Sequence, residues 1–285
     1  MNLPEREYTL SLPVGEIAIC EWGDEQGEAL LFLHGWLDNA ATFFSLAPLL
    51  QSHYRCIAID FPGHGLSSHL GDYAQYHFVD GSLAIHSVLE ALAITRCRLI
   101  GHSMGGALGL LYAACFPDQI SHLMSIDAFG PLVRAPEESV EQMREACIER
   151  SRRKESKKSL YRSVDLAVEI RAMAGDCASN LLRPIVERNL HEIDGGYQWR
   201  SDARLRWPSL LRLSPQHVHS FMQKLTMPTL VVQAEKGMSF VPKALQQFGA
   251  LLPRLQIEKV AGGHHVHLEQ PQRMAELALR FLQIQ

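Results

Sequence analysis

The chain has 285 residues, of which 47% are hydrophobic and 20% charged, and its formal net charge is −4. This composition is typical of globular proteins and excludes the disordered and fibrous classes. The negative charge, without a lysine-rich tail, gives no electrostatic reason to expect nucleic acid or an anionic membrane as a partner. Six cysteines stand singly without a CxxC pair, which indicates neither a disulfide framework nor a zinc site.

The N-terminal segment MNLPEREYTL lacks the apolar stretch of a signal peptide. No run of roughly 18 apolar residues, the length of a membrane-spanning helix, occurs in the sequence. We therefore expect a cytoplasmic protein with no membrane partner. A small neutral or weakly charged ligand fits the composition best, and no sequence pattern indicates an oligomeric state.

Short apolar runs alternate with stretches of helical spacing along most of the chain, which predicts strands and helices in turn. The expected strands are Leu30–Leu33, Arg55–Ile59, Arg98–Ile100, Leu123–Ile126 and Thr229–Val232, and the expected helices are Phe78–Leu92, Ala107–Phe116, Pro242–Leu251 and Gln272–Leu282. This alternation predicts an α/β fold, a mostly parallel twisted sheet with helices on both faces. The segments Tyr8–Leu12 and Ile17–Trp22 predict an antiparallel hairpin at the leading edge of the sheet.

The alternation breaks between Pro131 and Lys224, where no buried-strand run occurs and several helical patterns follow one another. We interpret residues 131–224 as an inserted helical lid. Residues 1–130 then form the first part of the core domain, and residues 225–285 form the second part.

The segment Gly101-His102-Ser103-Met104-Gly105-Gly106 contains a G-x-S-x-G motif between an apolar run and a helical pattern. In that context the serine is expected on a strained strand-to-helix turn, with glycines where neighbouring backbone comes close. Ser103 is therefore the candidate nucleophile. The backbone N–H of Met104, at the start of the following helix, is a candidate donor to an oxyanion.

A second loop, His34-Gly35-Trp36, directly follows the strand Leu30–Leu33. Here we expect a further backbone N–H aimed at the oxyanion, and Trp36 is the candidate. The side chain of His34 is expected to bind loop carbonyls rather than to act in catalysis.

A serine hydroxyl needs a base with a pKa near 7, a role suited to histidine. Three of the 14 histidines lie in Gly262-Gly263-His264-His265-Val266-His267, after the last apolar run and before the terminal helix. Two preceding glycines favour His264 as the base, with His265 and His267 packing or orienting the loop. A metal role is not expected, because the histidines have no acidic or cysteine partner nearby in the sequence.

A carboxylate should complete the arrangement by fixing the histidine tautomer. Two positions at expected strand ends supply one: Asp127, after Met124-Ser125-Ile126, and Glu235, just after Thr229–Gln233. The residues themselves leave this choice open.

Four segments in order carry a resemblance to the α/β-hydrolase superfamily: HGW at 34–36, DFPGHGLS at 60–67, GHSMGG at 101–106 and AGGHHVHLEQP at 261–271. The segment GGYQWRSDARLRWPS at 195–209 also resembles the serine hydrolase-like proteins, near the epoxide hydrolase and haloalkane dehalogenase group. The resemblance implies Ser103 as nucleophile, His264 as base, and Trp36 and Met104 as oxyanion donors. A serine in place of an aspartate nucleophile argues against epoxide hydrolase and dehalogenase chemistry.

Many relatives carry the acid in a G-x-x-D element after the seventh strand, where this chain has Ala234-Glu235-Lys236-Gly237. Relatives without that aspartate place the acid one strand earlier, which implies Asp127, with Glu235 as the alternative. We therefore expect a serine hydrolase of carboxylesterase type that acts on a small-molecule acyl substrate and needs no cofactor or metal. The alternatives are a thioesterase, an amidase, a carbon–carbon bond hydrolase, or a ligand-binding protein that retains the triad with little turnover.

Overall fold

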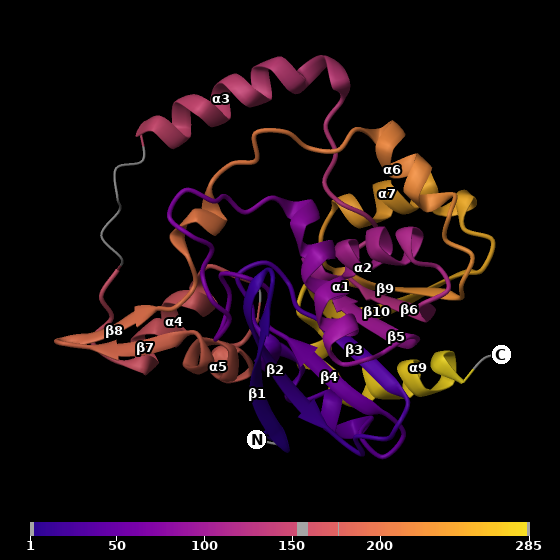
Figure 1. The fold of residues 1–285 in the computed structure, drawn as a ribbon, viewed down its shortest axis with the longest axis horizontal. Coiled ribbons are helices and arrows are strands. Elements are labelled where there is room, and N and C mark those ends of the chain that lie inside the picture. The colour runs from indigo at the N-terminus through magenta and orange to yellow at the C-terminus, as the bar shows by residue number, and fades with distance from the viewer. Residues whose placement is uncertain (1–2, 153–158, 176, 284–285) are drawn as a thin grey trace.

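An eight-stranded sheet forms the centre of the computed structural model, which describes residues 3–152, 159–175 and 177–283 (Figure 1). In spatial order the strands are β1 (Arg6–Leu12), β2 (Gly15–Trp22), β4 (Arg55–Ile59), β3 (Ala29–Leu33), β5 (Cys97–His102), β6 (Ile120–Ile126), β9 (Thr229–Lys236) and β10 (Leu255–Gly263). From β4 to β10 all neighbours are parallel, whereas β1 and β2 form an antiparallel hairpin at one edge, as predicted.

Helices cover both faces of this sheet, because alternate residues of each buried strand point to opposite sides. Leu31 and Leu33 of β3 belong to one apolar cluster, and Leu30 and Phe32 to another. The first cluster is covered by α1 (Gly81–Ala91), α2 (Met104–Cys115) and α7 (Phe240–Phe248), and the second by α9 (Pro271–Leu282). The predicted α/β class is confirmed.

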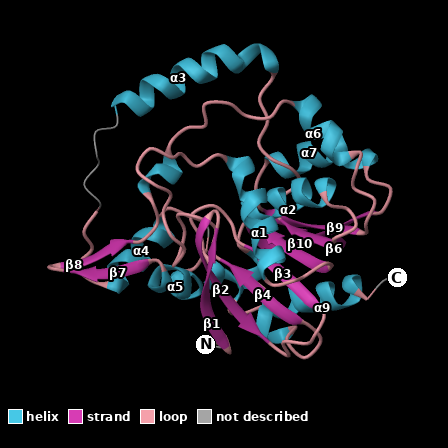
Figure 2. Cartoon of the chain, in the orientation of Figure 1, coloured by secondary structure: helices cyan, strands magenta, loops and turns pink. Residues whose placement is uncertain are grey.

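Between β6 and β9 the chain leaves the sheet and forms a mainly helical segment (Figure 2). Its helices are α3 (Ser139–Arg152), α4 (Val164–Met173), α5 (Ser179–Arg188) and α6 (Pro215–Met222). Figure 1 shows α3 at the outside of the molecule, whereas α6 packs on α2 and places Val218 and Met222 in the core. The last part of the segment therefore contributes to the main domain.

A two-stranded hairpin of β7 (Leu190–Ile193) and β8 (Gly196–Trp199) lies in the same segment and was not predicted. Each strand has only four residues and is mostly half-buried, so neither shows the apolar run of a buried strand. The turn uses Gly195 and Gly196, both at positive φ, and the backbone of Tyr161 approaches a Cβ position on Gly196 to 2.3 Å. Glycine is therefore required at that position.

None of the helices formed by the described residues combines the length and the apolar character needed to cross a membrane.

Candidate active site

Ser103 lies at the junction of β5 and α2 with φ 51° and ψ −116°, a conformation that non-glycine residues rarely adopt. The flanking glycines make this turn possible. A Cβ on Gly105 would lie 2.1 Å from the carbonyl oxygen of Leu33, and one on Gly101 would lie 2.5 Å from the amide nitrogen of Gly106. The motif therefore packs a helix directly onto neighbouring backbone and exposes part of Ser103.

His264 follows β10 and reaches Ser103 from the far end of the sequence. Its Nε2 atom lies 2.9 Å from the hydroxyl oxygen of Ser103, which is hydrogen-bond distance. The loop turns at Gly262, whose φ of 144° suits glycine. The two residues predicted as nucleophile and base thus lie side by side.

Asp127 completes a line of hydrogen bonds at the end of β6. Its Oδ2 atom lies 2.7 Å from Nδ1 of His264. The buried carboxylate also accepts N–H groups from Ala234, at 3.2 Å, and Met238, at 2.9 Å, which fix its orientation. The other candidate acid, Glu235, is exposed on β9, and the structure places Asp127 beside His264 instead.

The two expected oxyanion donors belong to segments that lie next to Ser103. Met104 is the first residue of α2, so its N–H has no carbonyl partner one turn earlier within the helix. Gly35 also lies close to Ser103, since a Cβ on it would lie 3.3 Å from Cβ of Ser103, and Trp36 follows Gly35 directly in the chain. The indole Nε1 of Trp36 donates to the carbonyl of Leu205 at 3.0 Å, which ties this loop to the inserted segment.

His34 and Asp60 hold the surrounding loops through the backbone. The Nε2 atom of His34 accepts the N–H of Phe61 at 3.0 Å, and its Nδ1 contacts the carbonyl of Gly35 at 2.7 Å. Asp60 accepts the N–H of Ala40 at 2.6 Å and pairs with Arg188. These contacts position the loops, as the sequence led us to expect for His34.

A second layer of buried polar groups lies behind His264, and the sequence reasoning missed two of its members, Asp38 and His102. Nε2 of His102 donates to the carbonyl of His264 at 2.9 Å. Oδ2 of Asp38 lies 3.1 Å from Nε2 of His265, the residue after His264. The position of His102 within the G-x-S-x-G motif, at the end of a buried strand, was the only signal available for it.

Burial and neighbouring charges shift the pKa values of the side chains in this layer. It lowers the pKa of His102 and His267 well below the ordinary histidine value, so both rings are neutral near pH 7. Burial alone would raise the pKa of Asp38, but His265 and Arg171 outweigh it, and the pKa of that carboxyl lies below its usual range. The buried carboxylate of Asp38 therefore lies beside the neutral ring of His102, close to His264.

A family model described as alpha/beta hydrolase fold matches residues 28–271, which include Ser103, Asp127 and His264. The chain belongs to this family. Among curated relatives of this α/β hydrolase is serine hydrolase-like protein 2 of Homo sapiens, which is 30% identical over 97% of this chain and 94% of its own length. The predicted resemblance to the serine hydrolase-like proteins is confirmed.

Solved structures agree with this assignment of the α/β hydrolase. A hypothetical protein from Pseudomonas aeruginosa PAO1 is 35% identical and superposes with a TM-score of 0.91 over 97% of this chain and 99% of its own. The thioesterase domain from the curacin biosynthetic pathway is 25% identical, with a TM-score of 0.85 over 96% of this chain and 99% of its own.

Proposed function

We propose that this chain is a serine hydrolase of carboxylesterase type that cleaves a small ester-like acyl substrate through an acyl-enzyme intermediate. The observation that carries the proposal is the hydrogen-bonded line from the Ser103 hydroxyl through His264 to the Asp127 carboxylate, with separations of 2.9 and 2.7 Å. This order of nucleophile, base and acid is the one that acyl transfer requires.

The roles follow from the atoms that face one another. In the proposed mechanism Nδ1 of His264 donates its proton to the Asp127 carboxylate, and Nε2 takes the proton of Ser103 as the serine oxygen attacks the carbonyl carbon. The backbone N–H groups of Met104 and Trp36 would then stabilise the negative charge on the carbonyl oxygen. His264 returns its proton to the leaving group, and water hydrolyses the acyl-enzyme with His264 again as base.

The inserted segment 131–224 is proposed to act as a lid over this site. The indole of Trp36, on the loop that would carry one oxyanion donor, binds the carbonyl of Leu205 in that segment. A movement of the segment would therefore also move the loop that carries the Trp36 N–H.

A thioesterase is the second candidate function, favoured by the likeness to the curacin thioesterase domain over nearly the whole chain. The same three residues serve both reactions, because both begin with attack of a serine oxygen on an acyl carbon. The leaving group is the difference, so substrates that share one acyl chain and differ in that group separate the two functions.

The test is hydrolysis of p-nitrophenyl esters from acetate to decanoate, alongside N-acetylcysteamine thioesters of the same acids, by the wild type and Ser103→Ala. We expect ester turnover that falls at least roughly a thousandfold in the variant. A fluorophosphonate should label the wild type once per chain and leave Ser103→Ala unlabelled. A higher kcat/KM for thioesters across the series would favour the second function, and labelling without turnover of either series would contradict both.

A further inference from the structure

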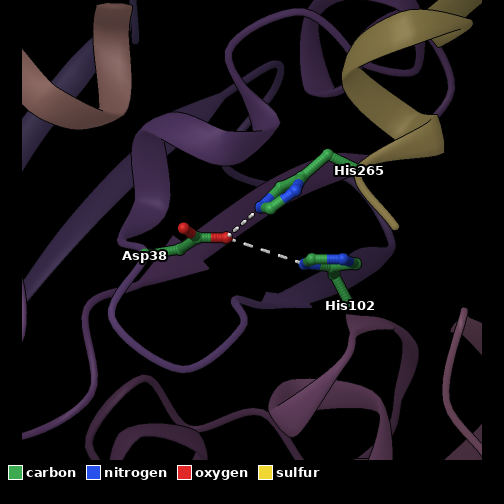
Figure 3. Close-up of side chains that lie close together, drawn as sticks. All are labelled: Asp38, His102 and His265. Carbon is green, nitrogen blue, oxygen red and sulfur yellow. Dashed lines mark hydrogen bonds and ion pairs between the residues drawn. The ribbon is translucent and has the colours of Figure 1, made fainter. Parts of the chain in front are cut away.

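Three buried side chains from distant parts of the chain lie close together (Figure 3). They lie next to the loop that carries His264. Asp38 follows β3, His102 ends β5 and His265 follows β10. Oδ2 of Asp38 lies 3.1 Å from Nε2 of His265 and 3.7 Å from Nδ1 of His102, and all three atoms lie within 4.8 Å of one another. Each side chain thus offers one ligand atom to the same small volume.

The Nδ1 atom of His102 has no hydrogen-bond partner among the described residues, although the ring is only 1% exposed. Its other nitrogen must carry the proton, because that atom donates to the carbonyl of His264. With the proton on Nε2, the Nδ1 atom faces Oδ2 of Asp38 at 3.7 Å, a separation longer than a hydrogen bond. A buried lone pair beside a carboxylate is unfavourable unless a donor or a cation fills the space between them, and a metal ion can do so.

Gly35 leaves the space beside this nitrogen open. A Cβ at Gly35 would lie 2.9 Å from Nδ1 of His102 and would close the approach to its lone pair. The orphaned nitrogen and the glycine beside it are two observations that point to the same unfilled coordination position.

We propose that Asp38, His102 and His265 form a zinc site of two imidazoles and one carboxylate, with water as a fourth ligand. Such a mixed nitrogen and oxygen set is one that Zn²⁺ favours. Tetrahedral ligands with bonds of about 2.0–2.1 Å lie about 3.3 Å apart, and the separations of 3.1 and 3.7 Å bracket that value. Small side-chain movements therefore suffice to bring the atoms into coordination distance.

From the sequence we expected no metal role, because the histidines near residue 264 have no acidic residue nearby along the chain. The fold supplies one, since Asp38 lies 227 residues from His265 in the chain. The remaining oxygen of Asp38 accepts a hydrogen bond from Nη2 of Arg171 on α4 at 3.2 Å, which aims Oδ2 toward the two histidines. Metal-bound carboxylates commonly have such an outer partner.

Arg171 also competes with the ion, because both are cations beside one carboxylate. Its side chain is 23% exposed, so it can move toward solvent when the ion binds. Removal of the guanidinium should therefore strengthen zinc binding, whereas removal of a true ligand should weaken it. An ordinary hydrogen-bonded cluster has no reason to show these opposite responses.

The site would stabilise the loop that carries His264, because His102 holds the carbonyl of His264 and His265 is its neighbour. It lies outside the proposed hydrolytic steps, so it does not depend on the reaction assigned to Ser103.

To test this, bound metal is removed from the purified full chain with a chelator. The protein is then titrated with Zn²⁺ in competition with a chromophoric chelator. In a separate titration with Co²⁺, visible absorption is recorded. We expect one tightly bound Zn²⁺ per chain and the intense Co²⁺ bands of a four-coordinate site. Affinity should fall at least about 100-fold in Asp38→Asn and in His265→Gln and should rise in Arg171→Gln. His53→Gln, an exposed histidine, is the matched control and should bind as the wild type does.

Weak wild-type binding, or affinity unchanged in both Asp38→Asn and His265→Gln, would overturn the proposal, as would loss of the site in His53→Gln. The Co²⁺ spectrum of the wild type tests coordination without any substitution, so a variant that fails to fold leaves the proposal open to refutation. An excess of Mg²⁺, which prefers six oxygen ligands, should not displace the zinc.

Discussion

A Cβ atom on Gly237 would lie 2.3 Å from each carboxylate oxygen of Asp127. The acid at the end of β6 therefore occupies the space that a side chain just after β9 would need. Position 237 is also where the G-x-x-D element of the sequence resemblance would place an aspartate. Glycine at position 237 therefore leaves room for the Asp127 carboxylate, and side chains at both positions cannot occupy this space at once.

If Asp127 is the acid, Asp127→Asn should lower kcat roughly a thousand- to ten-thousandfold, because the amide cannot hold the required His264 tautomer. Glu235→Gln, on an exposed side chain of β9, should remain near wild type. Steady-state hydrolysis of the best p-nitrophenyl ester measures both. Loss of activity in Glu235→Gln with retention in Asp127→Asn would reverse the assignment.

The position of the acid should be exchangeable. Residue 127 has a φ of 47°, which glycine adopts readily. Asp127→Gly therefore suits the backbone and removes the carboxylate that lies against Gly237. Adding Gly237→Asp to this variant should recover part of the lost kcat, because the new carboxylate begins where the old one lay. Gly237→Ala in the wild type is the comparison and should reduce activity through collision with Asp127. A double variant no more active than Asp127→Gly would argue against the exchange.

Trp36 should couple the oxyanion loop to the inserted segment. Trp36→Phe removes the hydrogen bond to Leu205, so amide hydrogen exchange at residues 203–207 should accelerate and kcat/KM should fall. Trp36→Phe should lower the free energy of unfolding by about 1 kcal/mol, because the side chain is half-exposed. Trp199→Phe, which removes an indole bond to Tyr161, is the control and should leave residues 203–207 unchanged. Unaltered exchange in Trp36→Phe would show that the bond does not hold the segment.

Much of the site could be predicted because its signals are local. Ser103 lies in a strand, turn and helix whose glycines are adjacent in the sequence, and two glycines precede His264. The choice between Asp127 and Glu235 was different, because Asp127 follows β6 and Glu235 lies near the end of β9 in the same sheet. The contact of Asp127 with His264 and the exposure of Glu235 separate them, and the residues alone do not show either.

The contacts within the layer behind His264 had no local signal, although His102 lies in the G-x-S-x-G motif and His265 lies next to His264. Asp38, His102 and His265 come together only when β3, β5 and β10 end at the same edge of the sheet, so the spacing of these residues along the chain says nothing of their contact. The β7–β8 hairpin was missed for a related reason. Its half-buried strands are too short to show a pattern, and they are stabilised by contacts with Tyr161 elsewhere in the chain.

Stability should fall steeply below neutral pH because buried histidines are kept neutral. Burial lowers the pKa of His34, His102 and His267, and that of His64 to about 3. In the unfolded chain these rings have a pKa of about 6.5, so below that pH the unfolded state binds protons that the folded state does not. Each ring then removes up to about 1.4 kcal/mol of unfolding free energy per pH unit. Urea unfolding between about pH 7.5 and 5.5 should show this slope, and His64→Gln should reduce it by about one ring's share. An equal slope in wild type and His64→Gln would mean that His64 is protonated in the folded protein.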